Sequence, residues 1–431
     1  KSAINKKKEP DNKYLQISEK PAWELLKKWK NINQNFAYYS FRSACGLEPS
    51  PQYLMFENYA HQTKWKIEDL IPEAKKWNLE HLDLSISSKF VGNFSEYNGS
   101  ENLYQKISKR YTENQSLLVG GYGEARPIYT TDAYKIKQNE GFEHRTIHMG
   151  VDFWQKVETA IHVLEDGEIY GCFDNANPKD YGPTIILKHQ MGDFVFFTLY
   201  GHLTRESLIG KTLGQKIKKG EKLAEIGDET VNGGWAPHLH FQIILDMLGH
   251  KNDFFGVSTP NLWPVFSNIC PDPNLLFKDS TLNINSNKML LDQIDFRKKH
   301  LGKSLSLSYD KPLKIVRGQM QFLIDDLGQK YLDTVNNVAH VGHEHPEVVK
   351  AGQSQMSVLN TNTRYLNDEI LEFSEELLKT FPPELSVLHF VNSGSEANEL
   401  AMRMAKAYSG QKDMIALEIG CHGNKQACID V

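Results

Sequence analysis

Three short segments of the chain carry histidines and an aspartate at spacings that could build a metal site. They are 148–152 (His-Met-Gly-Val-Asp), 199–202 (Leu-Tyr-Gly-His) and 238–241 (His-Leu-His-Phe). His148 and Asp152 are an even number of residues apart, so on an extended strand both face one side of the sheet, and the same holds for the two histidines of the third segment. Two imidazoles and a carboxylate suit Zn²⁺, which at a catalytic site takes three protein ligands and a water. The remaining histidines could then move protons, as metal-assisted hydrolysis requires.

A chance arrangement is the alternative, because the chain contains 16 histidines. A single His-x-His pair is uninformative, and His144 lies four residues before His148 with the same parity. The three segments in this order, inside one region rich in short strands, favour a metal site over separate structural histidines.

The region that must position these residues, 117–277, has the pattern of an all-β domain. Its short apolar or alternating runs are 159–164, 184–188, 193–199, 222–226 and 238–245. Gly, Asn, Asp and Pro residues separate these runs, as is typical of short strands joined by turns. Pro271 and Pro273 mark the end of the domain.

The three segments together resemble the lysostaphin-like (LytM-type) zinc endopeptidases, whose pattern is His-x-Gly-x-Asp, then Gly-His, then His-x-His. The resemblance implies a barrel-sandwich β fold in which His148, Asp152 and His240 bind Zn²⁺. It also implies that His202 and His238 are catalytic residues beside the metal-bound water. Which of these two is the base and which the stabiliser stays open.

The segment 219–227 (Lys-Gly-Glu-Lys-Leu-Ala-Glu-Ile-Gly) is similar to the same family, in which a strand begins after a Lys-Gly turn and ends at a Gly. Known members mostly cleave peptide cross-bridges of bacterial cell walls, which implies a peptide substrate. The alternative is a non-hydrolytic zinc or binding module that serves an aminotransferase or related lyase.

A second candidate site lies at 391–398 (Val-Asn-Ser-Gly-Ser-Glu-Ala-Asn). We expect it between a strand at 385–391 and a helix at 395–408. Small residues there let backbone N–H groups approach an anion, and a helix N-terminus favours negative charge. A tight turn with a serine cap is the structural alternative. A helix capped by Asn367 and a strand at 414–417 complete a βαβ pattern with a parallel sheet.

The wider context of this second site resembles the class III aminotransferases, which are fold-type I enzymes that use pyridoxal phosphate. The matching segments are 325–333, 340–346, 393–398 and 422–424. The resemblance implies a partial α/β domain in which Gly394 and Ser395 hold the cofactor phosphate. Cys421 stands where the family has an aromatic residue that stacks on the pyridine ring.

The Schiff-base lysine of this family, and the aspartate that pairs with the pyridinium nitrogen, come later in the sequence. None of Lys406, Lys412 and Lys425 has the matching context. The resemblance therefore implies an incomplete aminotransferase domain in a fragment of a longer bacterial protein. It also implies amine or keto substrates, and a homodimer for the full-length form.

We therefore expect a multidomain chain. Residues 1–116 are a mainly helical connector with helices near 21–30, 36–46 and 104–111. The zinc peptidase domain spans 117–277, a polar linker 278–310 and the aminotransferase segment 311–431.

The composition limits the kinds of partner and the location that we expect for the protein. Lys and Arg number 49 against 54 for Asp and Glu, and the net charge of -5 gives no reason to expect nucleic acid. No apolar run approaches the length of about 18 residues that a membrane-spanning helix needs. Five cysteines without metal-type spacing, and no visible signal peptide, favour a reduced, cytoplasmic location.

Overall fold

The structure, a computed structural model, describes residues 50–98, 100–129, 132–138, 141–282, 290–309, 312–335, 340–416 and 422–423. The helices expected near 21–30 and 36–46, as well as Cys421 and Lys425, lie outside these residues. The chain divides into two compact units, Lys1–Val349 and Lys350–Val431. Over the described ranges, no helix combines the length and apolar character needed to cross a bilayer.

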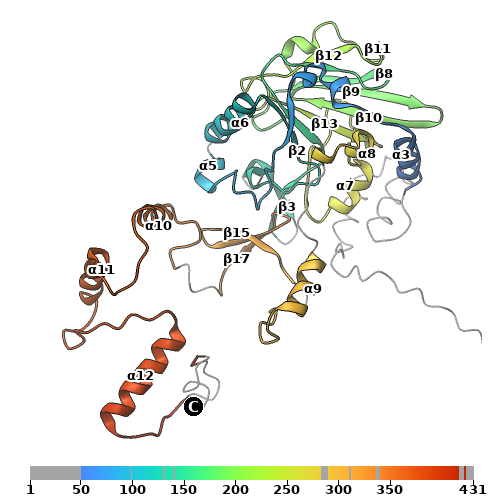
Figure 1. The fold of residues 1–431 in the computed structure, drawn as a ribbon. Helices are drawn as coiled ribbons and strands as arrows, with labels where there is room; N and C mark the ends of the chain where they lie inside the picture. The colour runs from blue at the N-terminus through green and yellow to red at the C-terminus, as the bar shows by residue number, and fades with distance from the viewer. Residues whose placement is uncertain are drawn as a thin grey trace, which may run out of the picture. The chain divides into compact units, whose positions relative to one another are not determined.

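The first unit is built on a sheet of eight strands in the order β1-β2-β6-β13-β10-β9-β8-β11 (Figure 1). Their bounds are β1 Asn78–His81, β2 Ser116–Gly120, β6 Val151–Trp154, β8 Gly167–Asn175, β9 Gly182–Met191, β10 Phe194–Gly201, β11 Lys216–Ile217 and β13 His238–Ile244. All neighbours are antiparallel except β1 and β2, which are parallel.

Three two-stranded pairs accompany this sheet: β3 Lys135–Gln138 with β4 Gly141–His144, β5 Ile147–His148 with β14 Val257–Ser258, and β7 Ala160–His162 with β12 Lys222–Glu225. The predicted all-β domain is confirmed. Each of the five runs expected as strands overlaps one, namely β7, β9, β10, β12 and β13.

Helices dominate the described residues that precede β2. They are α3 Pro51–Gln62, α4 Ile67–Leu70, the 3₁₀ helix η2 Pro72–Lys76, α5 Phe94–Asn98 and α6 Ser100–Asn114. The helix expected at 104–111 corresponds to α6. The Ser50 side chain caps α3 by accepting a hydrogen bond from the Tyr53 amide, and Pro51 is suited to the first helical position.

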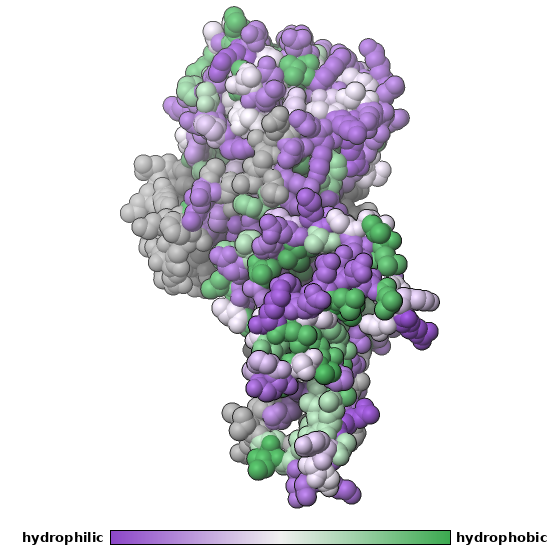
Figure 2. Space-filling model, turned by 90° about the vertical axis from the view of Figure 1, so that its left-hand side faces the viewer, coloured by the Kyte–Doolittle hydropathy of each residue, from purple (hydrophilic) through white to green (hydrophobic). Residues whose placement is uncertain are grey.

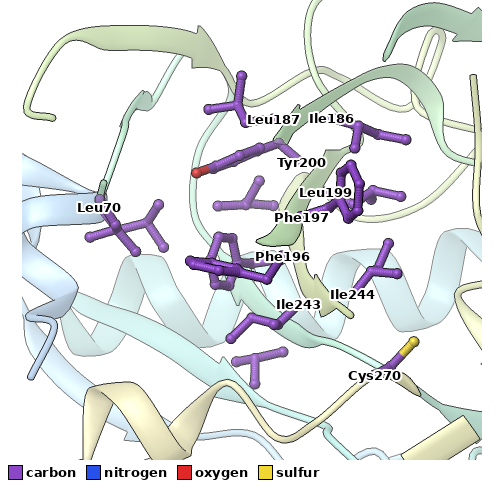
Figure 3. Close-up of a cluster of buried hydrophobic side chains, with 14 of the residues drawn as sticks. Leu70, Ile186, Leu187, Phe196, Phe197, Leu199, Tyr200, Ile243, Ile244 and Cys270 are labelled. Carbon is purple, nitrogen blue, oxygen red and sulfur yellow. The ribbon is translucent and has the colours of Figure 1, made fainter. Parts of the chain in front are cut away.

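These helices share a core with the β domain. The ring of Trp65 lies 6.1 Å from that of Phe241 in β13 and 6.4 Å from that of Phe196 in β10. Figure 3 shows Leu70 of α4 in the same buried cluster as Phe196 and Tyr200. Residues 51–71 therefore pack as part of the β domain, and the boundary expected after residue 116 falls inside β2.

Short helices connect and follow the strands. They are the 3₁₀ helices η3 Pro127–Tyr129, η4 Asp132–Tyr134, η5 Arg205–Leu208 and η6 Ser280–Leu282, and the α-helices α7 Trp263–Ile269, α8 Asn274–Phe277 and α9 Leu290–His300. The stretch 278–310, expected as a polar linker, thus contains helix α9. An antiparallel sheet of β15 Ile315–Gln319, β16 Phe322–Asp325 and β17 Lys330–Leu332 follows.

The C-terminal elements are α10 Pro346–Val358, α11 Asp368–Leu378 and α12 Gly394–Ser409. Asn367 caps α11 as predicted, and α12 covers the helix expected at 395–408. The prediction of a strand at 385–391 is wrong, because these residues have no regular secondary structure. The strand expected at 414–417 is absent from 414–416, the part of it that the structure describes.

The expected parallel sheet does not form over the described residues of the second unit. A β-strand is stable when a neighbouring strand accepts its backbone hydrogen bonds. The described residues after 350 contain no strand that could pair with 385–391, and the side chains of Leu385 and Val387 are 58% and 74% exposed. Apolar sequence alone therefore did not produce a strand there.

Candidate metal centre

Three strands bring the predicted metal ligands together. His148 ends β5, Asp152 lies in β6 and His240 lies in β13. β6 and β13 are antiparallel with Asp152 opposite His240, so the two side chains project from the same face. One side-chain atom from each of the three residues lies within 4.8 Å of the others.

The separations of these atoms match the edges of a small coordination polyhedron. His148 Nε2 lies 2.8 Å from His240 Nδ1 and 3.3 Å from Asp152 Oδ1, and His240 Nδ1 lies 3.2 Å from Asp152 Oδ1. Tetrahedral Zn²⁺ with bonds of about 2.0–2.2 Å would separate its ligand atoms by roughly 3.3–3.6 Å. Two of the three edges fit closely, and the two nitrogens would need to part by roughly half an ångström.

Hydrogen bonds on the far sides of both rings fix which nitrogen carries the proton. His148 Nδ1 lies 3.0 Å from the carbonyl oxygen of Gly121, so Nδ1 donates and Nε2 keeps a lone pair. His240 Nε2 lies 2.9 Å from Gln242 Oε1. The Gln242 amide nitrogen donates to the Phe255 carbonyl, which leaves Oε1 to accept from His240 and leaves His240 Nδ1 with a lone pair.

Three acceptor atoms therefore converge on one point: two imidazole lone pairs and a carboxylate oxygen. A proton would not resolve this arrangement, because burial and the positive charge of Arg126 lower the pKa of His148 to about 3. A bound cation would satisfy all three atoms at once, and the mixed nitrogen and oxygen set suits Zn²⁺.

Asp152 also belongs to a chain of buried ion pairs that the sequence did not indicate. Its Oδ2 lies 2.6 Å from Arg126 Nη1, and Arg126 Nε lies 2.6 Å from Glu124 Oε2. Glu124 Oε1 in turn accepts a hydrogen bond of 2.9 Å from the Leu84 amide. Burial alone would raise the pKa of Asp152, but the positive charge of Arg126 helps to hold it well below its usual range. Asp152 therefore stays ionised, as a metal ligand must.

The two predicted catalytic histidines lie beside this centre. His202 Nδ1 donates to the Asn232 carbonyl at 2.9 Å and His238 Nδ1 donates to the Ala236 carbonyl at 2.6 Å, so both Nε2 atoms keep a lone pair. The two ring centroids are 4.2 Å apart, and His238 Nε2 is 3.9 Å from Asp152 Oδ1. Burial lowers the pKa of both imidazoles, which keeps them neutral.

Backbone strain marks the position of His202, directly after β10. Its φ is +63°, in the left-handed region that costs most residues about a kilocalorie or more. The His202 amide donates to the Tyr181 carbonyl at 2.9 Å and holds this turn in place. Such strain is concentrated at functional sites.

All five of these residues line one cavity of about 400 Å³. Its walls also carry aromatic side chains, among them Tyr129, Trp154, Tyr181 and Trp235. A cavity of this size lies within the range of ligand-binding pockets in proteins.

The second candidate site is at the start of α12. Ser393 caps the helix by accepting a hydrogen bond of 3.2 Å from the Glu396 amide, and a Cβ built on Gly394 meets nothing within 4 Å. The Asn398 amide nitrogen donates to the His422 carbonyl at 2.9 Å. The structure thus brings 422–423 to the N-terminal part of α12, where the space beside Gly394 is open. Cys421 lies outside the described residues.

Comparison with known proteins assigns two families. Residues 146–252 match peptidase family M23, and residues 305–431 match the class-III aminotransferases. The chain therefore joins an M23 peptidase-like β domain to a class-III aminotransferase segment.

Individual relatives match the chain in part. A Drosophila melanogaster protein named alanine–glyoxylate aminotransferase 2-like is 46% identical over 36% of this chain and 32% of its own length. Ethanolamine-phosphate phospho-lyase homolog 1 of Caenorhabditis elegans is 38% identical over 34% of this chain and 30% of its own. The chain thus spans about a third of the length of these curated relatives.

Solved structures match in part as well. A phospholyase from Arthrobacter, in complex with phosphoethanolamine, shares 40% identity over 32% of this chain and 33% of its own, with a TM-score of 0.31. The catalytic domain of lysostaphin from Staphylococcus simulans shares 24% identity over 36% of this chain and 97% of its own, with a TM-score of 0.22.

Proposed function

We propose that the β domain is a zinc-dependent peptide hydrolase. The observation that carries this proposal is the convergence of three acceptor atoms, from His148, Asp152 and His240, without a donor between them. The match to peptidase family M23 supports it independently. Zn²⁺, when bound there, would supply a Lewis acid that polarises a peptide carbonyl and acidifies water.

The remaining two histidines supply the proton chemistry. The neutral imidazoles of His202 and His238 line the cavity with unprotonated Nε2 atoms, so either can accept a proton from an attacking water. Once protonated, the same ring can donate to a developing oxyanion or to the leaving amine. The aromatic walls orient the peptide and keep bulk water from the cleft.

This proposal separates metal binding from catalysis, and two variants test it. His148→Ala should lose stoichiometric zinc, because two ligands rarely hold it. His202→Ala should keep zinc and lose peptide cleavage by about 100-fold or more, since it removes a proton acceptor but no ligand. Metal analysis and a peptide-library cleavage assay measure the two properties. His162→Ala, outside the cavity, serves as the control.

Each outcome has a distinct meaning. Full cleavage by the His202→Ala variant removes this residue from the mechanism. Stoichiometric zinc in the His148→Ala variant contradicts the proposed ligand set. Zinc without any cleavage by the unaltered chain favours a non-hydrolytic binding module instead.

We propose further that the class-III segment belongs to a pyridoxal-phosphate enzyme acting on amine or keto substrates, an aminotransferase or a phospho-lyase, which is a homodimer in its complete form. The relatives carrying these two activities in their names support the choice. Gly394 and Ser395 would hold the phosphate at the α12 N-terminus, where the open space at Gly394 fits it. When bound, the cofactor supplies an electron sink for carbanion chemistry.

The phosphate contact gives this second proposal a direct test. Pyridoxal phosphate should bind the chain about tenfold more tightly than pyridoxal, because only the former offers a charge to the helix N-terminus. Fluorescence titration of both compounds measures the ratio. Gly394→Val should abolish the preference, whereas Gly352→Val in α10, where a Cβ also meets nothing within 4 Å, should not. Equal affinities of the unaltered chain for both compounds would contradict the assignment.

A further inference from the structure

Two cationic side chains on the cavity wall have no acidic partner among the described residues. Arg145 holds its guanidinium carbon 5.7 Å from the ring centroid of Tyr134, and Lys179 holds its Nζ 4.2 Å from that of Trp235. The Nε of Arg145 is buried and makes no hydrogen bond to described atoms. Both residues line the cavity that contains the four histidines and Asp152.

The acidic groups of the same cavity are already engaged elsewhere. Asp152 is paired with Arg126. Asp180 accepts hydrogen bonds from the Asn177 side chain and from the Tyr181 amide. The side chain of Asp253 lies 3.5 Å from that of His250. None of these three carboxylates forms an ion pair with Arg145 or Lys179, so both cations can still take an anionic partner.

Tyr129 connects the two cations to the metal centre. Its ring lies 6.4 Å from that of His148, 6.2 Å from that of Trp235 and 4.7 Å from that of Tyr134. Each cation rests on one of the last two rings. Arg145 and Lys179 thus stand within a few peptide units of the metal ligands, given that an extended residue spans about 3.3–3.6 Å.

The local backbone fixes both cations in place. The Arg145 amide donates to the Tyr134 carbonyl at 3.0 Å, and the Tyr134 hydroxyl donates to the Lys179 carbonyl at 3.1 Å. The Lys179 amide donates to the Gly233 carbonyl at 2.9 Å, and Lys179 has a φ of +66°, a strained value for a residue with a Cβ. Burial lowers the pKa of Lys179, because it disfavours the charged ammonium. A bound anion would favour the charged form and offset this effect.

We propose that Arg145 and Lys179 form an anion subsite that binds a carboxylate or phosphate group of the substrate beside the metal centre. The guanidinium fork can engage two oxygens of such a group, and the ammonium adds a compact charge. The proposal deepens the peptidase function above and rests on it. The peptide would carry its acidic group within a few residues of the bond to be cut.

Equilibrium binding to the full chain tests this without relying on cleavage. The probes all carry an acetylated N-terminus: tetraglycine with a free carboxylate, tetraglycine amide, and Gly-Gly-phosphoserine amide. Calorimetry with the zinc-loaded His202→Ala chain should give about tenfold or tighter binding of either anionic probe over the neutral amide. The carboxylate and phosphate probes show which anion is preferred.

Charge-removing variants then locate the effect. Adding Arg145→Gln and Lys179→Gln should abolish the preference and leave the affinity for tetraglycine amide within about twofold. Arg205→Gln with Lys251→Gln, which removes two cations outside the cavity, should leave the preference intact. Repeating the titrations after chelation separates this site from the metal, because the preference should survive zinc removal.

Four results would overturn the subsite. Equal affinity for all three probes, or absence of binding by any probe, would show that the cavity does not select anions. A preference that persists in the Arg145→Gln, Lys179→Gln chain would place the anion elsewhere. A preference that vanishes on chelation would place it on the metal. A chain that fails to bind zinc contradicts the proposed hydrolase alone, since the anion preference is still measurable.

Discussion

At the scale of single residues, the centre depends on groups that never touch the metal position. Gly121 and Gln242 accept the outward protons of His148 and His240 and thereby turn the lone pairs of both rings inward. A Cβ built on Gly121 would lie 1.9 Å from Arg126 Nη2 and 3.0 Å from His148 Nδ1, so only glycine fits at this approach. The ligand geometry is thus fixed before any metal arrives.

Substitution of Arg126 tests how much the groups around the metal ligands contribute to stability. Its side chain is 2% exposed and pairs with Glu124 and Asp152, so Arg126→Ala leaves two buried carboxylates without a counter-charge. We expect the free energy of unfolding of the metal-free chain to fall by about 3–5 kcal/mol. Arg110→Ala, which breaks a partly exposed pair with Glu80, should cost about 0–1 kcal/mol. Urea unfolding followed by circular dichroism measures both.

If both variants lose the same free energy of unfolding, the buried ion-pair chain contributes no more to stability than a surface salt bridge does. Zinc affinity of the Arg126→Ala chain should also fall, by about 10–100-fold, because the unsupported carboxylate can reorient.

The sequence placed five residues at this centre, and the structure brings all five into one cavity. Their parity along strands and their order along the chain were enough to group them. Arg126 and Gln242 were missed because each acts only through its contact with a ligand, and Glu124 was missed because it acts through Arg126. No spacing rule connects a buried arginine to an aspartate 26 residues later. Such partners emerge only when the strands are paired.

At the scale of elements, strand β9 contains a buried histidine that is unrelated to the metal and contacts β10. His189 is 1% exposed, with Nδ1 3.0 Å from the Asp166 carbonyl oxygen and Nε2 2.7 Å from Thr198 Oγ1. Burial lowers the pKa of His189. In the unfolded chain the same imidazole titrates near 6.5. Below that pH the unfolded state binds the extra proton, so stability falls as the solution is acidified.

We expect His189→Gln to reduce the pH dependence of stability between pH 6.5 and 5. The wild-type slope should exceed that of the variant by up to about 1.4 kcal/mol per pH unit. His162→Gln, at a more exposed site, should keep the wild-type slope. Urea unfolding at several pH values, with metal removed, gives the comparison. Parallel slopes for wild type and His189→Gln would contradict a buried neutral imidazole.

The elements that the sequence predicted well are those that are stabilised by residues close to them in the sequence. Strands β9, β10 and β13 have short apolar or alternating runs, and α11 and α12 have side-chain caps at Asn367 and Ser393. The strand expected at 385–391 failed because its formation depends on a partner strand and not on its own residues. Likewise, the pairing of β1 with β2 joins two distant segments that no local pattern connects.

At the scale of the whole molecule, the two units differ in how far they bury their apolar side chains. The β domain buries a large cluster around β10 and β13 (Figure 3). In contrast, none of the described residues of α10, α11 or α12 is buried, and Leu366 and Tyr408 are 98% and 97% exposed. On the face that Figure 2 shows, purple predominates over the β domain, whereas green areas are interspersed with purple over the C-terminal elements.

An amphipathic helix derives most of its stability from burying its apolar face, so α11 and α12 should be marginal in this chain. We expect their backbone amides to exchange with deuterium at least about 100-fold faster than those of β10 and β13, since core strands open only with global unfolding. Exchange mass spectrometry resolves these peptides in one experiment, with α6, whose Ile107 is buried in a core, as a helical control. Protection of α11 equal to that of α6 would mean that its apolar face is covered in solution, most simply by another copy of the chain. Dilution would then distinguish the two cases, because protection that comes from association falls with protein concentration.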